Sequence, residues 1–319
     1  MTKFVLRRIL VAIPTLVAIS IIIFTILQLA PGDPFGQLAL NPDVPPEVRA
    51  NLRKQYHLDD PIPVQYVGWA TQAIKGNWGF SFVSRVNVLE LIRQRLPTTI
   101  MIVGSAYLIA LAIAIPVGIL SAVKQYSAVD NIATTLAFLG YSLPTFFTGL
   151  LFILFFSIYL RWLPFIYTAD IQASGLSYLW QLFQHAVMPI MVLALFQAAS
   201  LTRYVRASML DVIRQDYVRT ARAKGMREIR VTLTHAFRNA LIPVVTIIAL
   251  DIPTIFTGAL ITEQIFRVPG IGSLLINSLQ SKDTPVIMFI VFTYAILVVI
   301  FTLLADIMYG VLDPRVKFA

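Results

Sequence analysis

The sequence predicts an all-α, polytopic membrane protein with six transmembrane helices, and two observations carry that prediction. Hydrophobic residues make up 58% of the 319 residues and charged residues only 13%, which is too apolar for an ordinary soluble domain. Nearly charge-free stretches also recur, most of them long enough to cross about 30 Å of hydrocarbon. The chain contains no cysteine, so disulfides and thiolate metal sites are excluded.

Six spans are expected, because each of these stretches is apolar and carries little charge. In chain order they are Ile9–Ala30, Pro97–Val123, Asn131–Leu160, His185–Leu201, Asn239–Thr262 and Thr284–Ala305. The third contains Ser142-Leu143-Pro144, and we expect it to bend there, since neighbouring helices can satisfy the backbone groups that a proline frees. The first is too long for the core of a signal peptide and is read as a retained span.

The distribution of charge predicts the orientation and the division of the chain. Arg203–Arg238 contains nine basic and three acidic residues, so we expect this loop in the cytoplasm, together with both termini. The predicted parts are an N-terminal tip and first helix (1–30), an external loop with short amphipathic helices (31–96), a five-helix core (97–310) that includes a cytoplasmic loop (206–238), and a cytoplasmic tail (311–319). The net charge of +9 does not indicate nucleic-acid binding, because this topology explains it.

The basic loop predicts a helix, a glycine corner and a second helix. Asp216 is expected to cap a short helix, Tyr217–Lys224, and Gly225 to end it in a left-handed conformation. The second helix is expected because four apolar residues recur on one stripe, namely Met226, Ile229, Leu233 and Phe237. An alternative is a basic loop that rests on anionic lipid headgroups.

The loop reads DYVRTARAKG at 216–225 and HAFRNALIPV at 235–244. These strings resemble the coupling loop of permease subunits in ABC importers of the peptide/nickel (dipeptide/oligopeptide) transport family. PGDP at 31–34, EQIFRVPGIG at 263–272 and YGVLDPR at 309–315 resemble further motifs of the same family. Many other importers have Glu-Ala-Ala where this chain has Arg219, Thr220 and Ala221, which fits the peptide/nickel branch.

The resemblance implies a type I ABC importer permease fold in a bacterial cytoplasmic (inner) membrane, without a cofactor. Its implied partners are a second homologous permease in a heterodimer, two ATP-binding cassette ATPase subunits and an extracytoplasmic solute-binding protein. Substrates in the family include dipeptides, oligopeptides, glutathione, nickel chelates and sugars. The residues that the resemblance places at the ATPase contact are Asp216, Tyr217, Arg219, Thr220, Ala221, Arg222, Ala223, Lys224 and Gly225.

Several kinds of chemistry are not expected from this sequence. The absence of a G-x-x-x-x-G-K-[ST] motif means that ATP would be bound by another subunit. His57, His185 and His235 lack metal-ligand spacing. No G-x-S-x-G elbow and no carboxylate pair suited to acid–base work is present, so an enzyme is not expected.

Asp251 is the one ionisable residue expected near the centre of a span. It is a candidate lining residue of the translocation path, or else it makes a helix-packing hydrogen bond near Pro253; both readings stay open. Asp306, near a span end, is expected to be capped or paired. The alternative function is an ion-coupled secondary transporter, which usually has intramembrane ionisable relays and two related halves. No repeat between halves is visible here.

Overall fold

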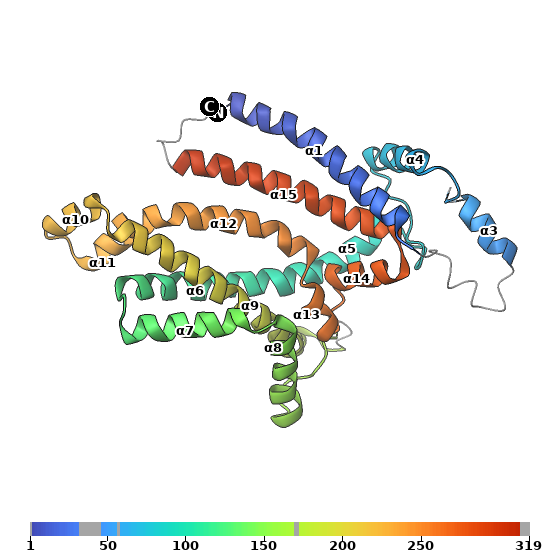
Figure 1. Cartoon of the computed structure of the whole chain (residues 1–319). Coiled ribbons are helices and arrows are strands. Elements are labelled where there is room, and N and C mark those ends of the chain that lie inside the picture. The colour runs from blue at the N-terminus through green and yellow to red at the C-terminus, as the bar shows by residue number, and fades with distance from the viewer. Residues whose placement is uncertain (1, 32–45, 56–57, 169–171, 313–319) are drawn as a thin grey trace.

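The computed structural model describes residues 2–31, 46–55, 58–168 and 172–312, and the elements named in them are all helices. Long helices lie side by side along one common direction (Figure 1). Five are long and apolar enough to cross a membrane, and a bent helix pair makes a sixth if it is counted as one span. The all-α, multi-span fold predicted from the sequence is thereby confirmed.

The N-terminal part contains a long helix followed by shorter ones: α1 (Thr2–Leu29), α3 (Pro46–Gln55) and α4 (Ile62–Ile74). The next span is one continuous rod made of α5 (Val88–Thr99), the π-helical turn η1 (Ile100–Gly104) and α6 (Ser105–Val123). The helix begins before Pro97, the predicted start of this span. The helix begins at Val88 because the Asn87 side chain accepts a hydrogen bond from the Leu89 backbone N–H.

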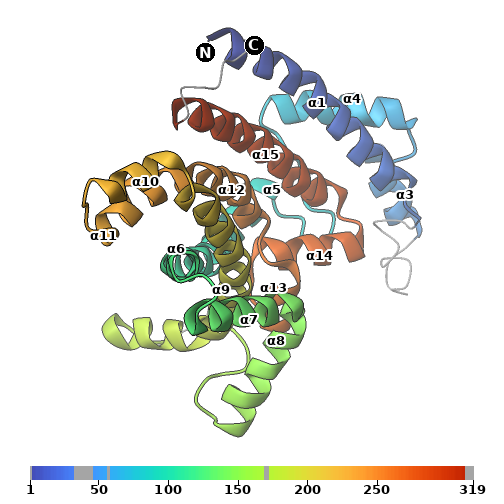
Figure 2. The ribbon, with the colours of Figure 1, turned by 60° about the vertical axis from the view of Figure 1, so that its left-hand side comes forward.

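The third span is broken as predicted. Its first half is α7 (Ala128–Ser142), and its second half is α8 (Thr145–Phe152) with the π-helical turn η2 (Ile153–Tyr159). The two halves meet at 98°, so α8 projects away from the bundle (Figures 1 and 2). Pro144 lies in the break, where its missing N–H costs no helical hydrogen bond.

The remaining helices, in chain order, are α9 (Gly175–Ile213), α10 (Asp216–Ala223), α11 (Glu228–Arg230), the π-helical turn η3 (Val231–Phe237), α12 (Arg238–Thr257), α13 (Leu260–Ile265), α14 (Ile271–Ser281) and α15 (Thr284–Leu312). Two helices have limits that differ from the predicted span limits. α9 begins at Gly175, earlier than His185, and α12 ends at Thr257, before Thr262, because Gly258 adopts φ +74°.

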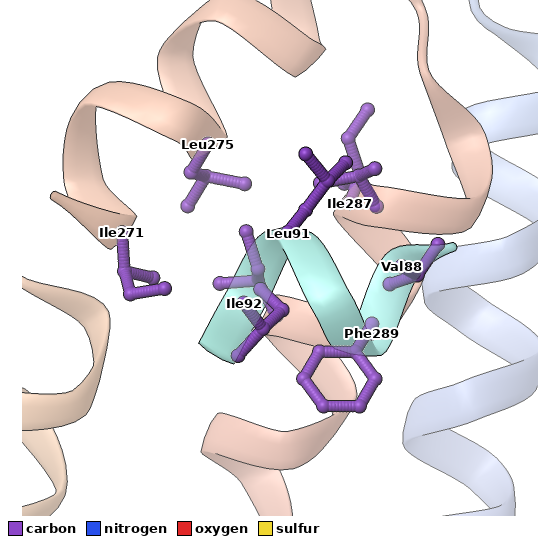
Figure 3. Close-up of a cluster of buried hydrophobic side chains, with 9 residues drawn as sticks. Val88, Leu91, Ile92, Ile271, Leu275, Ile287 and Phe289 are labelled. Carbon is purple, nitrogen blue, oxygen red and sulfur yellow. The ribbon is translucent and has the colours of Figure 1, made fainter. Parts of the chain in front are cut away.

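A cluster of apolar side chains packs the end of the bundle that lies away from α10. Val88, Leu91 and Ile92 of α5 meet residues of α14 and α15, among them Leu275 and Phe289 (Figure 3). At the opposite end of α15, Asp306 forms an ion pair with Arg8 of α1, 2.9 Å between Oδ2 and Nη2. The pairing predicted for Asp306 is confirmed, and it holds the first helix against the last.

Helices α6 and α9 approach closely at the centre of the bundle, and Gly118 makes this possible. A Cβ at Gly118 would lie 2.7 Å from Cβ and Cγ1 of Val205 and 3.1 Å from the Thr202 carbonyl oxygen. At Gly104 of the same rod, an added Cβ would meet only Ile100 Cγ2, at 3.8 Å.

Gly118→Ala is therefore expected to destabilise the folded protein by about 1–3 kcal/mol through overpacking. Gly104→Ala is the matched control, since it brings the same gain in helix propensity without the clash. Thermal unfolding in detergent, followed by tryptophan fluorescence, measures both variants. Equal melting temperatures for the two would show that α6 and α9 do not pack at Gly118.

Candidate functional site

The basic loop forms a small helical projection at one end of the bundle, where α10 and α11 lie beyond the ends of α9 and α12 (Figures 1 and 2). Val218 and Ala221 are spaced three residues apart on α10 and are 0% and 5% exposed. They pack into an apolar cluster with Val205 and Met209 of α9 and Val231 of η3. One face of α10 is thus fixed to the membrane helices.

The opposite face of α10 is exposed. The predicted contact residues that are exposed here are Asp216, Tyr217, Arg219, Thr220, Arg222, Ala223, Lys224 and Gly225. Ala221 belongs to the buried face and helps to hold the helix in place. Val218 also helps to hold the helix in place. It was not predicted from the sequence, although its spacing from Ala221 indicates that the two residues share a helix face.

The two ends of α10 differ in how well they were predicted. Gly225 has φ +72°, so the predicted glycine corner is confirmed. The predicted cap is wrong: Gln215 occupies the N-cap position without a side-chain hydrogen bond, and Asp216 is the first helical residue. The Asp216 carboxylate still lies where the helix dipole favours negative charge, and it is 3.3 Å from Nη2 of Arg219.

An ion pair across the glycine corner ties α10 to α11. Nη2 of Arg222 lies 2.6 Å from Oε1 of Glu228, and Nε of Arg222 lies 3.1 Å from both carboxylate oxygens. The hydrogen bond to this carboxylate raises the pKa of Arg222. Both side chains are largely exposed, so the pair sets the angle of the corner more than it adds stability.

The second helix of the loop has only part of the face that was predicted: Met226 and Phe237 pack against the apolar cluster, and the other two stripe residues do not. Ile229 and Leu233 of the predicted stripe are 70% and 49% exposed. The buried face consists of Val231, Ala236 and Ala240. The π-helical turn η3 is the reason, since its i→i+5 hydrogen bonds shift the phase of the side chains relative to a regular α-helix.

Next to the projection, an ion pair with a buried carboxylate and a partly exposed arginine joins α7 to α9. Arg206 donates two hydrogen bonds to Asp130, from Nε to Oδ1 (2.7 Å) and from Nη2 to Oδ2 (2.8 Å). Ser121, Thr134 and the Tyr126 backbone N–H also donate to this carboxylate. Asp130 is 2% exposed. The sequence offers no signal for this contact, because its partners are far apart in the chain.

Asp251 lies where α6, α9 and α12 meet. Its Oδ2 accepts hydrogen bonds from the Tyr107 hydroxyl (3.2 Å) and from Nε2 of Gln197 (2.9 Å). Both donors also line a cavity of about 320 Å³, together with Thr254. The helix-packing hydrogen bonds considered for Asp251 are present, and the lining role stays a prediction.

A second buried carboxylate, Glu263, opens the motif at 263–272 and was not named as a site residue from the sequence. It is 1% exposed and accepts hydrogen bonds from the Ser273 backbone N–H (2.8 Å) and the Thr99 hydroxyl (3.2 Å). Gly258 and Gly270 leave room for it, since a Cβ at either would lie 2.4 Å from a Glu263 oxygen. Glu263 holds in place the segment that follows the end of α12.

Residues 32–34 and 313–315 of the other two motifs lie outside the described residues.

The fold and this loop define a multi-pass membrane protein that carries a rigid helical projection between two of its long helices. Comparison with known proteins identifies the family of membrane proteins to which it belongs. Residues 114–318 match the family model of the binding-protein-dependent transport system inner membrane component, and residues 1–103 match the model of the N-terminal part of such components. The chain therefore belongs to this family, which confirms the resemblance seen in the loop motifs.

Similar proteins extend over the whole chain. The oligopeptide transport system permease protein AppB of Bacillus subtilis is 41% identical over 320 residues, covering 100% of both chains. The dipeptide transport system permease protein DppB of Escherichia coli K12 is 36% identical over 336 residues (99% of both). The glutathione transport system permease protein GsiC of Salmonella choleraesuis is 35% identical over 318 residues (100% of both). This chain is a permease subunit of a binding-protein-dependent importer in the inner membrane.

We expect Gly225→Val to uncouple the importer while the subunit still inserts, because a β-branched residue is poorly tolerated at positive φ. No atom lies within 4 Å of the position of an added Cβ, so the strain arises from the backbone alone. Gly225→Asn is the matched control, since asparagine tolerates the left-handed region. The measurement is substrate-stimulated ATP hydrolysis by the assembled importer. Equal stimulation in the valine and asparagine variants would contradict the corner.

Proposed function

We propose that this chain forms half of the translocation path of an ATP-driven importer of di- or oligopeptides. The three relatives described above are named for transport of oligopeptides, dipeptides and glutathione, and all of these substrates are short peptides. Full-length similarity to each supports the same substrate class here. In this role the chain transports the substrate without making or breaking covalent bonds in it.

We propose further that α10 is the helix through which an ATPase subunit moves this permease. The observation that carries this proposal is that α10 has one face buried against α9 and η3 and the other face exposed and basic. A helix held in this way can transmit a push to both flanking spans. The chain has no phosphate-binding loop of its own, so the energy would come from that separate subunit.

The proposed assembly contains this chain, a second homologous permease, two ATP-binding cassette ATPases and an extracytoplasmic solute-binding protein. The cytoplasmic side would carry both termini and the loop 206–238, and the external side would carry the loop 31–96. Closure of the ATPase dimer on ATP would draw the two coupling helices together and open the path outward, and hydrolysis would reverse this. ATP can shift this equilibrium only because its subunits bind it differently in the two states.

An ion-coupled carrier remains the competing function, and Asp251 is where the two differ. A proton relay needs a carboxyl that binds and releases a proton during each cycle. In the importer, Asp251 acts through hydrogen bonds to Tyr107 and Gln197, which an amide of similar size can partly replace. The anchored projection also has no role in a simple carrier.

The test is uptake by proteoliposomes that contain the complete importer, with ATP inside and an uncoupler present. Wild type is expected to accumulate substrate under these conditions, and Asp251→Asn to retain ATP-dependent uptake at a reduced rate. Uptake by wild type that required a proton gradient and ignored ATP would refute the importer.

A further inference from the structure

We propose that the cavity beside Asp251 is a binding subsite for a primary ammonium group, which in a peptide substrate is the free amino end. The proposal rests on the proposed function, because it assumes that peptides pass this point. The cavity lies among α6, α9 and the segment that follows α12, and Tyr107, Gln197 and Thr254 supply its hydrogen-bonding groups near Asp251.

The first argument concerns charge. Asp130 and Asp306 each form an ion pair with an arginine, Arg206 and Arg8 respectively. Asp251 forms no ion pair within the part of the chain that the structure describes, and its two side-chain partners are neutral. A carboxylate at this depth in a membrane is costly unless it is paired or faces a cavity. A cation in the adjacent cavity would balance the charge.

The second argument concerns hydrogen-bond donors. The Tyr107 hydroxyl and one N–H of Gln197 donate hydrogen bonds to Oδ2 of Asp251. The Thr254 hydroxyl donates a hydrogen bond to the Asp251 backbone carbonyl (2.6 Å). Both hydroxyl groups have thereby used their only proton. The two hydroxyl groups and the amide oxygen of Gln197 can still offer lone pairs, and Gln197 keeps one further N–H, so acceptors outnumber donors in this set. An ammonium group, with three N–H donors and no acceptor, matches such a set.

The third argument concerns size and the rest of the wall. A volume of about 320 Å³ is near the lower end for ligand pockets, so it suits one end of a short peptide. The remaining lining is mainly apolar, including Leu193, Phe196 and Leu260, and no basic side chain is among the lining residues. Asp251 is not itself a lining residue, so its carboxylate would act on the ammonium group through Tyr107 and Gln197, which line the pocket and donate to that carboxylate. No basic lining residue that the structure describes would compete for this charge, and an aromatic ring face also attracts cations.

The experiment uses the importer assembled with its permease and ATPase partners in nanodiscs, without the binding protein, whose own selectivity would hide the effect. Equilibrium dialysis measures retention of radiolabelled alanyl-alanine and N-acetyl-alanyl-alanine. We expect wild type to bind the free peptide at least about tenfold more tightly than the acetylated one, since a charge-assisted hydrogen bond is lost. Asp251→Asn should remove that preference, and Asp251→Glu should largely keep it.

Asp306→Asn is the matched control, because it also replaces an intramembrane carboxylate by an amide, but away from the cavity; it should bind as wild type does. N-acetyl-alanyl-lysine distinguishes the amino end from a lysine side chain, and we expect it to bind as weakly as the other acetylated peptide. Equal binding of free and acetylated alanyl-alanine by wild type, or no binding of either, would overturn the subsite. Neither result would affect ATP-dependent uptake, so the proposed function would stand or fall separately.

Discussion

The ion pair between Arg206, whose side chain is 25% exposed, and the buried Asp130 is the contact on which the half of the molecule next to α10 depends. Removing two charges from water costs several kcal/mol each, and good geometry with further hydrogen bonds is needed to offset that cost. Both conditions are met here, since the arginine contacts both carboxylate oxygens and three other groups donate to the same carboxylate. Loss of either partner would leave an uncompensated charge. The pair holds the turn between α6 and α7 against α9 immediately before the projection begins.

That anchoring links the projection to the polar site in the membrane. Gln197 and Arg206 belong to the same uninterrupted helix α9, and from Gln197 to the end of α9 the rise is about 24 Å. On the other side of α10, η3 continues into α12, which carries Asp251. The hydrogen bond between Gln197 and Asp251 therefore joins the two helices that α10 connects. Under the proposed function, a rotation imposed at α10 would change the geometry around Asp251 and thereby the binding of a substrate there.

The sequence predicted what local chemistry dictates and missed what depends on distant contacts. Apolar runs identify spans because hydrocarbon tolerates few charges, and Gly225 identifies the corner because few residues accept its φ. Apolar runs do not show where the helices begin when helices extend beyond the run, as at Val88 and Gly175. Part of the stripe in the second loop helix failed because η3 departs from the regular period. Glu263 escaped notice because only the folded chain shows that glycines enclose it.

The central claim is that α10 faces the cytoplasm and contacts an ATPase subunit. Because the chain has no cysteine, Thr220→Cys places a single thiol on the exposed face of α10, and Ala50→Cys places one on α3 at the opposite end. In intact cells, an impermeant thiol reagent should label position 50 and spare position 220. In the assembled importer, a thiol cross-linker should join position 220 to the ATPase. Labelling of position 220 from outside, or cross-linking to the ATPase from position 50 only, would contradict the account.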